Sequence, residues 1–295
     1  MKFKLSRATP ADKNAVLRLS RHFPDDYLEE VVDRWINMDT GGLFLAWHND
    51  FLIGCCALSF PSPAEGWLHG MRVHPDYQGQ GIAFELNSYL IDRAKSKGAA
   101  VVRLLTAPDN HGALRVSAKL GLQAAGKREI IYRETLIPGK NTIFRQGASL
   151  RLCSASDLPA GTDRISSGPF QRAASGMLFL PGGYSFRSLS AAYLYQAIKN
   201  NEVYAFYHRD LLRGLVVVVR NKDERHLVIG YLDLPPEDLP SIASMLPLWA
   251  GEGYCYFSLS LFPEQHRALH PALQQWFGTY DAHQWLLMEK ELLQD

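Results

Sequence analysis

This chain of 295 residues has no long apolar run, no large net charge and no CxxC motif. No apolar run approaches the roughly 20 residues that cross a bilayer. No apolar segment follows the two N-terminal lysines, as a secretory signal would require. Lys and Arg number 31 and Asp and Glu 30, so the net charge of +1 attracts neither nucleic acid nor an anionic membrane. We therefore expect a cytoplasmic protein without nucleic-acid or membrane partners.

The four cysteines form no CxxC pair and no cluster with the spacing of a zinc site. Cys55 and Cys56 are adjacent in an apolar stretch, and Cys153 and Cys255 stand alone. This pattern predicts reduced and mostly buried thiols. His266 and His270, four residues apart on an expected helix, would supply half a metal site, but no third ligand is evident. We expect no metal.

The length is about twice the commonest domain size, which favours two domains. Apolar residues make up 47% and charged residues 21% of the chain, which is ordinary for a globular protein. Pro and Gly punctuate residues 137–142, between two patterned segments, so this stretch is the best candidate for a linker. We predict domains at 1–140 and 141–295.

The two halves show the same order of elements. Strands are expected near 3–7, 42–48, 51–60, 66–74, 100–106, 122–126 and 128–136, then at 202–208, 211–220, 225–233, 254–262 and 283–291. Helices are expected near 10–20, 25–37, 80–97 and 110–120, then near 188–199, 237–251 and 264–276. Strands with helices interspersed predict an α/β (α+β) fold. The matched order indicates duplication of one unit.

The most informative stretch is VHPDYQGQGIA at residues 73–83. A strand ends at Val73, Pro75 and Asp76 turn the chain, and Gly79 and Gly81 open a helix. The free N–H groups of a first helical turn, together with the helix dipole, form an anion site suited to a pyrophosphate. A P-loop is excluded because no Lys-Ser or Lys-Thr follows the glycines. A dinucleotide fingerprint is also disfavoured, since Phe84 stands where its third small residue belongs.

Residues 78–83, QGQGIA, fit instead the Q/R-x-x-G-x-G/A signature of the GNAT superfamily of N-acetyltransferases. A second segment, NHGAL at 110–114 followed by KLGL at 119–122, is similar to the later N-x-x-A and k-l-G-F segment of that family. The chain therefore resembles a GNAT acetyltransferase in its first half. The resemblance implies two GNAT-like domains, each a mixed, mostly antiparallel sheet flanked by helices.

The same resemblance implies acetyl-CoA as cosubstrate, held between splayed strands near 66–74 and 100–106. The pyrophosphate would meet the backbone of 79–83, and the pantetheine would pair with the backbone of the preceding strand. The function implied is transfer of the acetyl group, by direct attack, to a primary amine of a small molecule or amino acid. An acyl-CoA-binding regulatory or sensor protein without transferase activity is the alternative. The expected cofactor-binding residues are Met71, Val73, Gln78, Gly79, Gln80, Gly81, Ile82, Ala83 and Asn110.

Three side chains are candidates for proton transfer: His69, Glu65 and Ser117. Strand alternation puts Glu65, Trp67, His69, Met71 and Val73 on one face, with Arg72 on the other. His69 is the preferred base because an ordinary imidazole titrates near neutral pH. Ser117 stands where the family usually has a tyrosine as general acid, so it is either a weak substitute or a helix surface residue.

Acidic residues near the second expected helix have two interpretations. Asp25, Asp26, Glu29 and Glu30 would either attract an amine acceptor or cap the helix.

In the second half, residues 234–241 are in register with the glycine signature of the first half. This segment has no glycine and contains Glu237, Asp238 and Pro240. Carboxylates there repel a pyrophosphate, so we expect a degenerate second domain and one cofactor site per chain. Acceptor identity stays open, as does the choice between monomer and homodimer.

Overall fold

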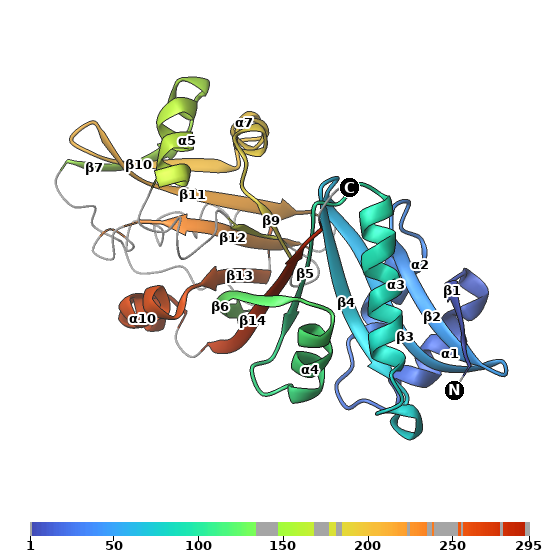
Figure 1. Cartoon of the computed structure of the whole chain (residues 1–295). Coiled ribbons are helices and arrows are strands. Elements are labelled where there is room, and N and C mark those ends of the chain that lie inside the picture. Colours follow the sequence, from blue (N-terminus) through green and yellow to red (C-terminus); the bar gives the residue numbers. More distant parts are fainter. Residues whose placement is uncertain are drawn as a thin grey trace. The chain divides into compact units, whose positions relative to one another are not determined.

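The structure is a computed structural model. It describes residues 2–133, 147–167, 177–180, 185–222, 225–234, 238, 253–254, 256–277 and 280–292. The chain divides into two compact units. Unit 1 comprises Met1–Ala125 and Leu286–Asp295, and unit 2 comprises Gly126–Trp285. Figure 1 colours the chain from its N-terminus in blue to its C-terminus in red.

Unit 1 is a sheet with helices on both faces. Its strands follow the order β1-β2-β3-β4-β5-β14, antiparallel except for the parallel pair β4–β5. Helix α3 packs on one face, and α1 and α2 pack on the other (Figure 1). The elements are β1 (Lys4–Arg7), η1 (Pro10–Asp12), α1 (Lys13–Ser20), α2 (Leu28–Ile36), β2 (Gly42–His48), β3 (Phe51–Ser62), β4 (Glu65–Val73), η2 (Pro75–Tyr77), α3 (Ile82–Ser96), β5 (Val101–Thr106), α4 (His111–Lys119) and the end of β14 (Asp281–Glu291).

Unit 2 has a sheet of the same kind and a separate hairpin, β8–β9. The sheet order is β6-β13-β12-β11-β10-β7, with β12 and β13 parallel. The elements are β6 (Gln123–Arg133, which begins in unit 1), β7 (Ala148–Leu152), η3 (Ala155–Asp157), α5 (Leu158–Ser167), β8 (Met177–Leu180), β9 (Ser185–Ser188), α7 (Ala191–Lys199), β10 (Val203–His208), β11 (Leu211–Asn221), β12 (His226–Asp233), β13 (Tyr256–Leu261) and α10 (Pro263–Phe277).

The predicted fold class is confirmed, since both sheets are mixed, mostly antiparallel and flanked by helices. The sequence did not indicate β7, α5 or the β8–β9 hairpin. The expected linker at 137–142 lies outside the described residues, as does the expected helix at 237–251 apart from residue 238. Most of the segment 234–241, on which the degenerate-domain prediction rests, lies outside them too.

The same local motifs, capping boxes and hairpin turns, recur at matching places in the two units. Thr9 and Asp12 form a capping box after β1, and Ser154 and Asp157 form one after β7. The β2–β3 hairpin turns through Asn49 and Asp50, both with positive φ, and the β10–β11 hairpin turns through residues 209–210 in the same way. These local matches agree with the duplication that the order of elements indicates.

The C-terminal strand returns to unit 1, which the predicted cut at residue 140 does not allow for. Residues Leu286–Glu291 of β14 pair with β5 in antiparallel register. Met288 and Leu292 join the core beneath α3, and the Leu292 N–H donates to the Ala100 carbonyl at 2.7 Å. Unit 1 is thus built from two distant segments. Local patterning shows that residues 283–291 form a strand, but not which strand it pairs with.

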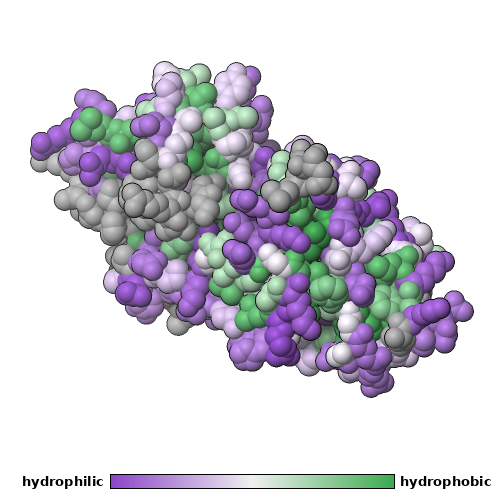
Figure 2. Space-filling model, viewed as in Figure 1, coloured by the Kyte–Doolittle hydropathy of each residue, from purple (hydrophilic) through white to green (hydrophobic). Residues whose placement is uncertain are grey.

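None of the described helices is long and apolar enough to cross a bilayer. In the view of Figure 2, hydrophobic residues reach the surface among hydrophilic ones. Scattered exposure of this kind is ordinary for a folded protein.

We expect Met288→Asp to destabilise unit 1 strongly. Met288 is 6% exposed, and its replacement would bury a carboxylate in an apolar core. An unpaired buried charge costs several kcal/mol, which lowers the melting temperature by roughly 10 °C in a protein of this size. Met288→Leu is the matched control and should cost less than about 1.5 kcal/mol. Equal melting temperatures for the two variants would show that β14 is not part of the unit 1 core.

Candidate active site

Strands β4 and β5 pair only where they begin. The parallel ladder joins Glu65 to Val101, Gly66 to Val102 and Trp67 to Arg103. Beyond these pairs β4 continues to Val73. In the described part of the chain, β5 does not pair with residues 68–73 of β4. Residues 68–73 therefore present a backbone edge that β5 does not satisfy, which we call the open edge of β4. An edge of this kind is a template for an extended ligand.

A one-residue bulge in β4 accounts for the end of the ladder. Cys55 of β3 pairs with Arg72 and Ala57 pairs with His69, so Gly70 and residue 71 together oppose a single residue of β3. A bulge bends and twists its strand. Gly70 has φ +55°, and a Cβ there would lie 2.6 Å from the Trp35 ring. Only glycine fits this position.

The bulge also reverses the side-chain alternation, so the predicted common face of Glu65, Trp67, His69, Met71 and Val73 is wrong. His69 contacts Trp35 of α2, with ring centroids 5.5 Å apart, and Arg72 is ion-paired on that same face. Met71 and Val73 instead pack with the core residues beneath α3. His69 and Arg72 thus share the α1–α2 face, contrary to prediction.

The turn after β4 leads into α3 through two glycines in the left-handed region. Gly79 has φ +76° and Gly81 has φ +85°, and an added Cβ at either would meet nothing within 4 Å. The first hydrogen bond of α3 runs from the Glu85 N–H to the Gly81 carbonyl. The N–H groups of the first turn, which include those of Ile82 and Ala83, therefore have no partner inside the helix. Free N–H groups at the start of a helix can bind an anion, and these lie beside open space.

Gln78 and Gln80 hold this turn with their side chains. The Gln78 side-chain amide donates to the Val73 carbonyl at 3.2 Å, and that of Gln80 donates to the Asp76 carbonyl at 3.2 Å. Both side chains thus stabilise the loop, as does the Gln78 backbone N–H, which donates to the Pro75 carbonyl at 3.2 Å.

His69 lies next to the bulge. Its Nε2 is 2.5 Å from the Ser59 Oγ, and its ring also lies 6.3 Å from that of Trp67. The tautomer decides which of Nε2 and Oγ donates. Ser59 and Trp35 were not among the predicted site residues, because only the fold brings β3 and α2 to this face. These contacts fix the imidazole at the open edge of β4.

Arg72 and Asp26 form a bidentate salt bridge on the same face. Arg72 Nη2 lies 2.8 Å from Asp26 Oδ1, and Nε lies 3.1 Å from Oδ2. Asp26 also accepts from the Leu28 N–H at 3.2 Å, so it helps to cap α2. The guanidinium lies 5.3 Å from the Tyr27 ring centroid, and burial raises the pKa of the Tyr27 hydroxyl. The other three acids, Asp25, Glu29 and Glu30, are exposed.

Glu65 does not lie at the open edge of β4. Its Oε1 pairs with Arg103 Nη1 at 2.6 Å, and its Oε2 accepts from the Ser62 hydroxyl at 2.7 Å. Arg103 also donates to Glu289 at 2.9 Å. Four residues of strand, about 13 Å, separate Glu65 from His69. The geometry therefore favours a structural role for this carboxylate over the predicted role of base.

The two candidates on α4 are both tied to that helix. Asn110 caps it, since Oδ1 accepts from the Ala113 N–H at 3.0 Å. Ser117 is 2% exposed, and its carbonyl accepts from the Leu122 N–H at 2.9 Å. Ser117 is therefore not a helix surface residue.

The cysteines of unit 1 do not supply a nucleophile. Cys55 and Cys56 are free and buried. Burial raises the pKa of Cys55 to about 12 and raises that of Cys56 as well. At neutral pH both thiols stay protonated, and the thiolate is the reactive form.

Among the described residues, no group of three or more His, Cys, Asp or Glu side chains could hold a metal ion. In unit 2, His266 and His270 both contact the Tyr280 hydroxyl, at 2.9 and 2.6 Å.

Comparison with known proteins adds two kinds of similarity. Residues 14–122 match the model of the acetyltransferase (GNAT) family. A mycothiol acetyltransferase of Sanguibacter keddieii is 30% identical over 106 residues, which cover 34% of this chain and 33% of that protein. The match therefore spans about a third of that relative's length.

Solved structures match over nearly the whole chain. A GCN5-related N-acetyltransferase from Sphaerobacter thermophilus has a TM-score of 0.64 at 16% identity, covering 98% of this chain and 95% of that one. A tandem GNAT protein from the clavulanic acid biosynthesis pathway has a TM-score of 0.53 at 13% identity, covering all of both chains. At these identities the similarity establishes the fold.

We expect Asp26→Leu to destabilise unit 1 by about 3 kcal/mol, because it leaves the Arg72 guanidinium without its carboxylate in a largely buried site. The Asp26 side chain is 2% exposed and that of Arg72 is 19% exposed. The double variant Asp26→Leu/Arg72→Met should regain much of this loss, since no charge is then left unpaired. Urea denaturation measures both. The single variant Arg72→Met completes the comparison. If the losses of Asp26→Leu and Arg72→Met simply add in the double variant, the two side chains do not interact.

Proposed function

We propose that the chain is an N-acetyltransferase of the GNAT family, since residues 14–122 match the model of that family. Acetyl-CoA is the cosubstrate, and the acceptor is a primary amine of a small molecule or amino acid. The observation that carries the proposal is the open edge of β4 running directly into the glycine-lined start of α3. An extended ligand with an anionic end fits that combination.

Unit 1 binds acetyl-CoA through backbone groups. The first-turn N–H groups around Gly79, Gly81 and Ala83 receive the pyrophosphate. The backbone of Met71 and Val73 at the open edge of β4 receives the pantetheine as an added strand. Gln78 and Gln80 support this site by holding the turn between the two. Asn110 contributes by starting α4 in its place.

Bound acetyl-CoA supplies an activated acetyl group. The backbone N–H near Val73 donates to the acetyl oxygen and stabilises the charge that develops there. His69 takes the proton of the incoming ammonium, directly or through a water, from the α1–α2 face. Ser117 is buried and lacks the acidity of a phenol, so protonation of the departing thiolate falls to solvent. The protonated thiols of Cys55 and Cys56 support direct attack over a cysteine-bound acyl enzyme.

The position of Ser117 also favours a second candidate function, an acyl-CoA-binding regulatory protein without turnover. A thiol-specific dye separates the two functions when acetyl-CoA is offered with a panel of primary amines. Acceptor-dependent release of the CoA thiol supports the transferase. Saturable acetyl-CoA binding without release by any amine would instead support the regulatory protein.

We expect Gly81→Glu to abolish acetyl-CoA binding. The new carboxylate would occupy the open space beside the first turn of α3 and repel the pyrophosphate. Gly98→Glu is the matched control. Gly98 has φ +89° and equally open surroundings, but it lies beyond the far end of α3, more than about 20 Å away.

Both substitutions carry the same backbone cost of about 1 kcal/mol, because each forces a side chain into the left-handed region. Calorimetry should give one acetyl-CoA per chain for wild type and Gly98→Glu, and no binding for Gly81→Glu. Equal affinities for the two variants would place the cosubstrate elsewhere, and a stoichiometry of two would contradict a degenerate unit 2.

We expect His69→Gln to lower kcat/KM by about 10²-fold while acetyl-CoA affinity stays unchanged. A base must be unprotonated, so the wild-type rate should fall at low pH, where His69 takes up a proton. Two acceptors with different amine pKa values separate the enzyme's titration from the acceptor's. An acid limb that moves with the acceptor, together with near-normal turnover of His69→Gln, would assign the proton to solvent.

A further inference from the structure

The α1–α2 face of unit 1 carries a tyrosine that the proposed reaction does not use. Tyr27 directly precedes α2, and its ring meets the Trp35 ring edge-on, with centroids 6.1 Å apart. Its hydroxyl reaches the bulge of β4, since a Cβ on Gly70 would lie 3.5 Å from the hydroxyl oxygen. His69 precedes Gly70 in β4 and contacts the same tryptophan. The phenol and the proposed base therefore lie close together on one face of the sheet.

Tyr27 faces both solvent and the bulge. The residue is 41% exposed, yet burial raises the pKa of its hydroxyl, and the Arg72 cation acts in the opposite direction. The hydroxyl end is thus turned inward while part of the ring stays open to solvent. An ordinary phenol titrates near pH 10, so with a raised pKa this hydroxyl keeps its proton at neutral pH. Tyr27 therefore presents a protonated hydroxyl at the bulge and is reached from solvent.

The proton of this hydroxyl has no acceptor within the described part of the chain. The hydrogen-bond partner of the hydroxyl there is Arg72, and a guanidinium can only donate. Arg72 is itself held by the Asp26 carboxylate at 2.8 and 3.1 Å and by the Met71 carbonyl at 3.0 Å. Arg72 thus fixes the phenol oxygen, and the O–H group is left to donate to a ligand.

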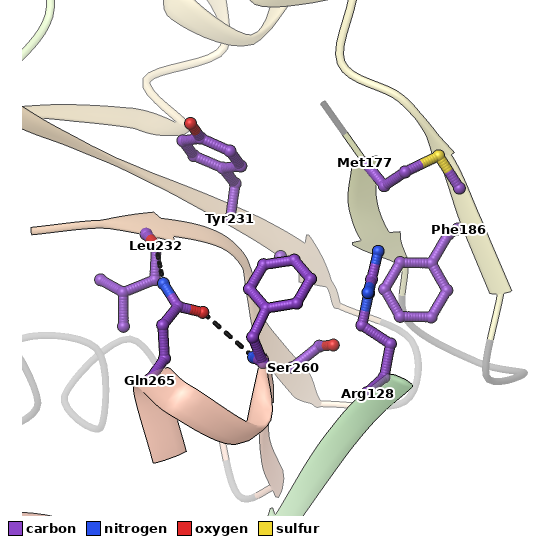
Figure 3. Close-up of a pocket in the computed structure, with 9 residues that line it drawn as sticks. Arg128, Met177, Phe186, Tyr231, Leu232, Ser260 and Gln265 are labelled. Atoms are coloured by element: carbon purple, nitrogen blue, oxygen red, sulfur yellow. Dashed lines mark hydrogen bonds between the residues drawn. The ribbon is translucent and has the colours of Figure 1, made fainter. Parts of the chain in front are cut away.

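Unit 2 has the same bulge, but there the chain itself covers it. Gly230 is an extra residue of β12 at the point where the parallel ladder with β13 ends. Hairpin β8–β9 lies against it, since a Cβ on Gly230 would be 2.5 Å from the Phe179 carbonyl oxygen. Arg128 and Gln265 line a cavity there, and both ends of the Gln265 side-chain amide are hydrogen-bonded to backbone groups (Figure 3). The comparison favours the bulge of unit 1, with its half-exposed tyrosine, as the one that receives an acceptor.

We propose that Tyr27 selects the acceptor and that the acceptor is an α-amino carbonyl compound, either an amino acid or its amide. This inference rests on the proposed function, because it names the substrate class of the same site. An amine that gives its proton to His69 lies beside Gly70, within reach of the Tyr27 hydroxyl. The carbonyl oxygen of such a compound is close to its amine and accepts from the phenol. An alkylamine leaves the phenol without an acceptor, and a site built around a hydrogen bond rejects a ligand that cannot make it.

Three acceptors of similar size test the selection: alanine, alaninamide and propan-2-amine. Tyr27→Phe removes the hydroxyl and keeps the ring that contacts Trp35 and Arg72. With saturating acetyl-CoA, it should lower kcat/KM about tenfold for alanine and about threefold for alaninamide, whose oxygen carries no charge. For propan-2-amine the change should stay below about twofold, since that amine makes no contact with the hydroxyl. Comparing variant with wild type for each acceptor cancels the different intrinsic reactivities of the amines.

Tyr195→Phe is the matched control, because Tyr195 is also 41% exposed but lies on α7 of unit 2. It should leave the rates with all three acceptors unchanged. A binding measurement tests the inference apart from turnover. With CoA in place of acetyl-CoA, ligand-observed NMR should show that alanine binds about tenfold more weakly to Tyr27→Phe than to wild type. Propan-2-amine should bind equally to both.

Three results would overturn the inference. One is an equal loss for all three acceptors in Tyr27→Phe, which would make the tyrosine a structural residue. Another is wild-type binding of propan-2-amine as tight as that of alanine. The third is a lack of binding by alanine and alaninamide alike. Failure of the proposed function is a different result: no acceptor then releases the CoA thiol, and the binding comparison in the presence of CoA still decides the role of Tyr27.

Discussion

The bulge in β4 is the constraint on which the rest of unit 1 depends. One extra residue around Gly70 ends the parallel ladder with β5 and exposes the backbone edge of 68–73. It turns His69 and Arg72 toward the α1–α2 face while Met71 and Val73 face α3. In the proposed function, acetyl-CoA would bind along the open edge of β4, and the acceptor would approach it from the α1–α2 face, where His69 lies.

The bulge recurs in unit 2 with different contents. There Gly230 marks the end of the β12–β13 ladder, but a hairpin packs against it and a buried arginine lines the resulting cavity. The two units thus share the bulge at the end of the parallel ladder, while the side chains around it differ.

The sequence predicted those features that depend on local patterning. Alternating apolar residues placed most of the strands, the positive-φ turn at Asn49 and Asp50 was visible as a turn pair, and Gly79 and Gly81 indicated the start of α3. These signals depend on residues that are neighbours in the chain.

Features that depend on partners far along the chain were missed. A bulge is set by the register between β3 and β4, so strand alternation alone placed Met71 with His69. The sequence alone made Glu65 a candidate base, because only the parallel ladder between β4 and β5 brings Arg103 beside it. The return of β14 to β5 joins segments about 185 residues apart, and no local pattern encodes that choice.

Backbone hydrogen exchange with and without acetyl-CoA tests the central claim most directly. If the open edge of β4 and the first turn of α3 hold the cosubstrate, amides in 71–73 and 79–84 should slow on binding. Amides of β12 should not change. Protection in 226–233 without protection in 71–84 would contradict the account, because it would place acetyl-CoA in unit 2.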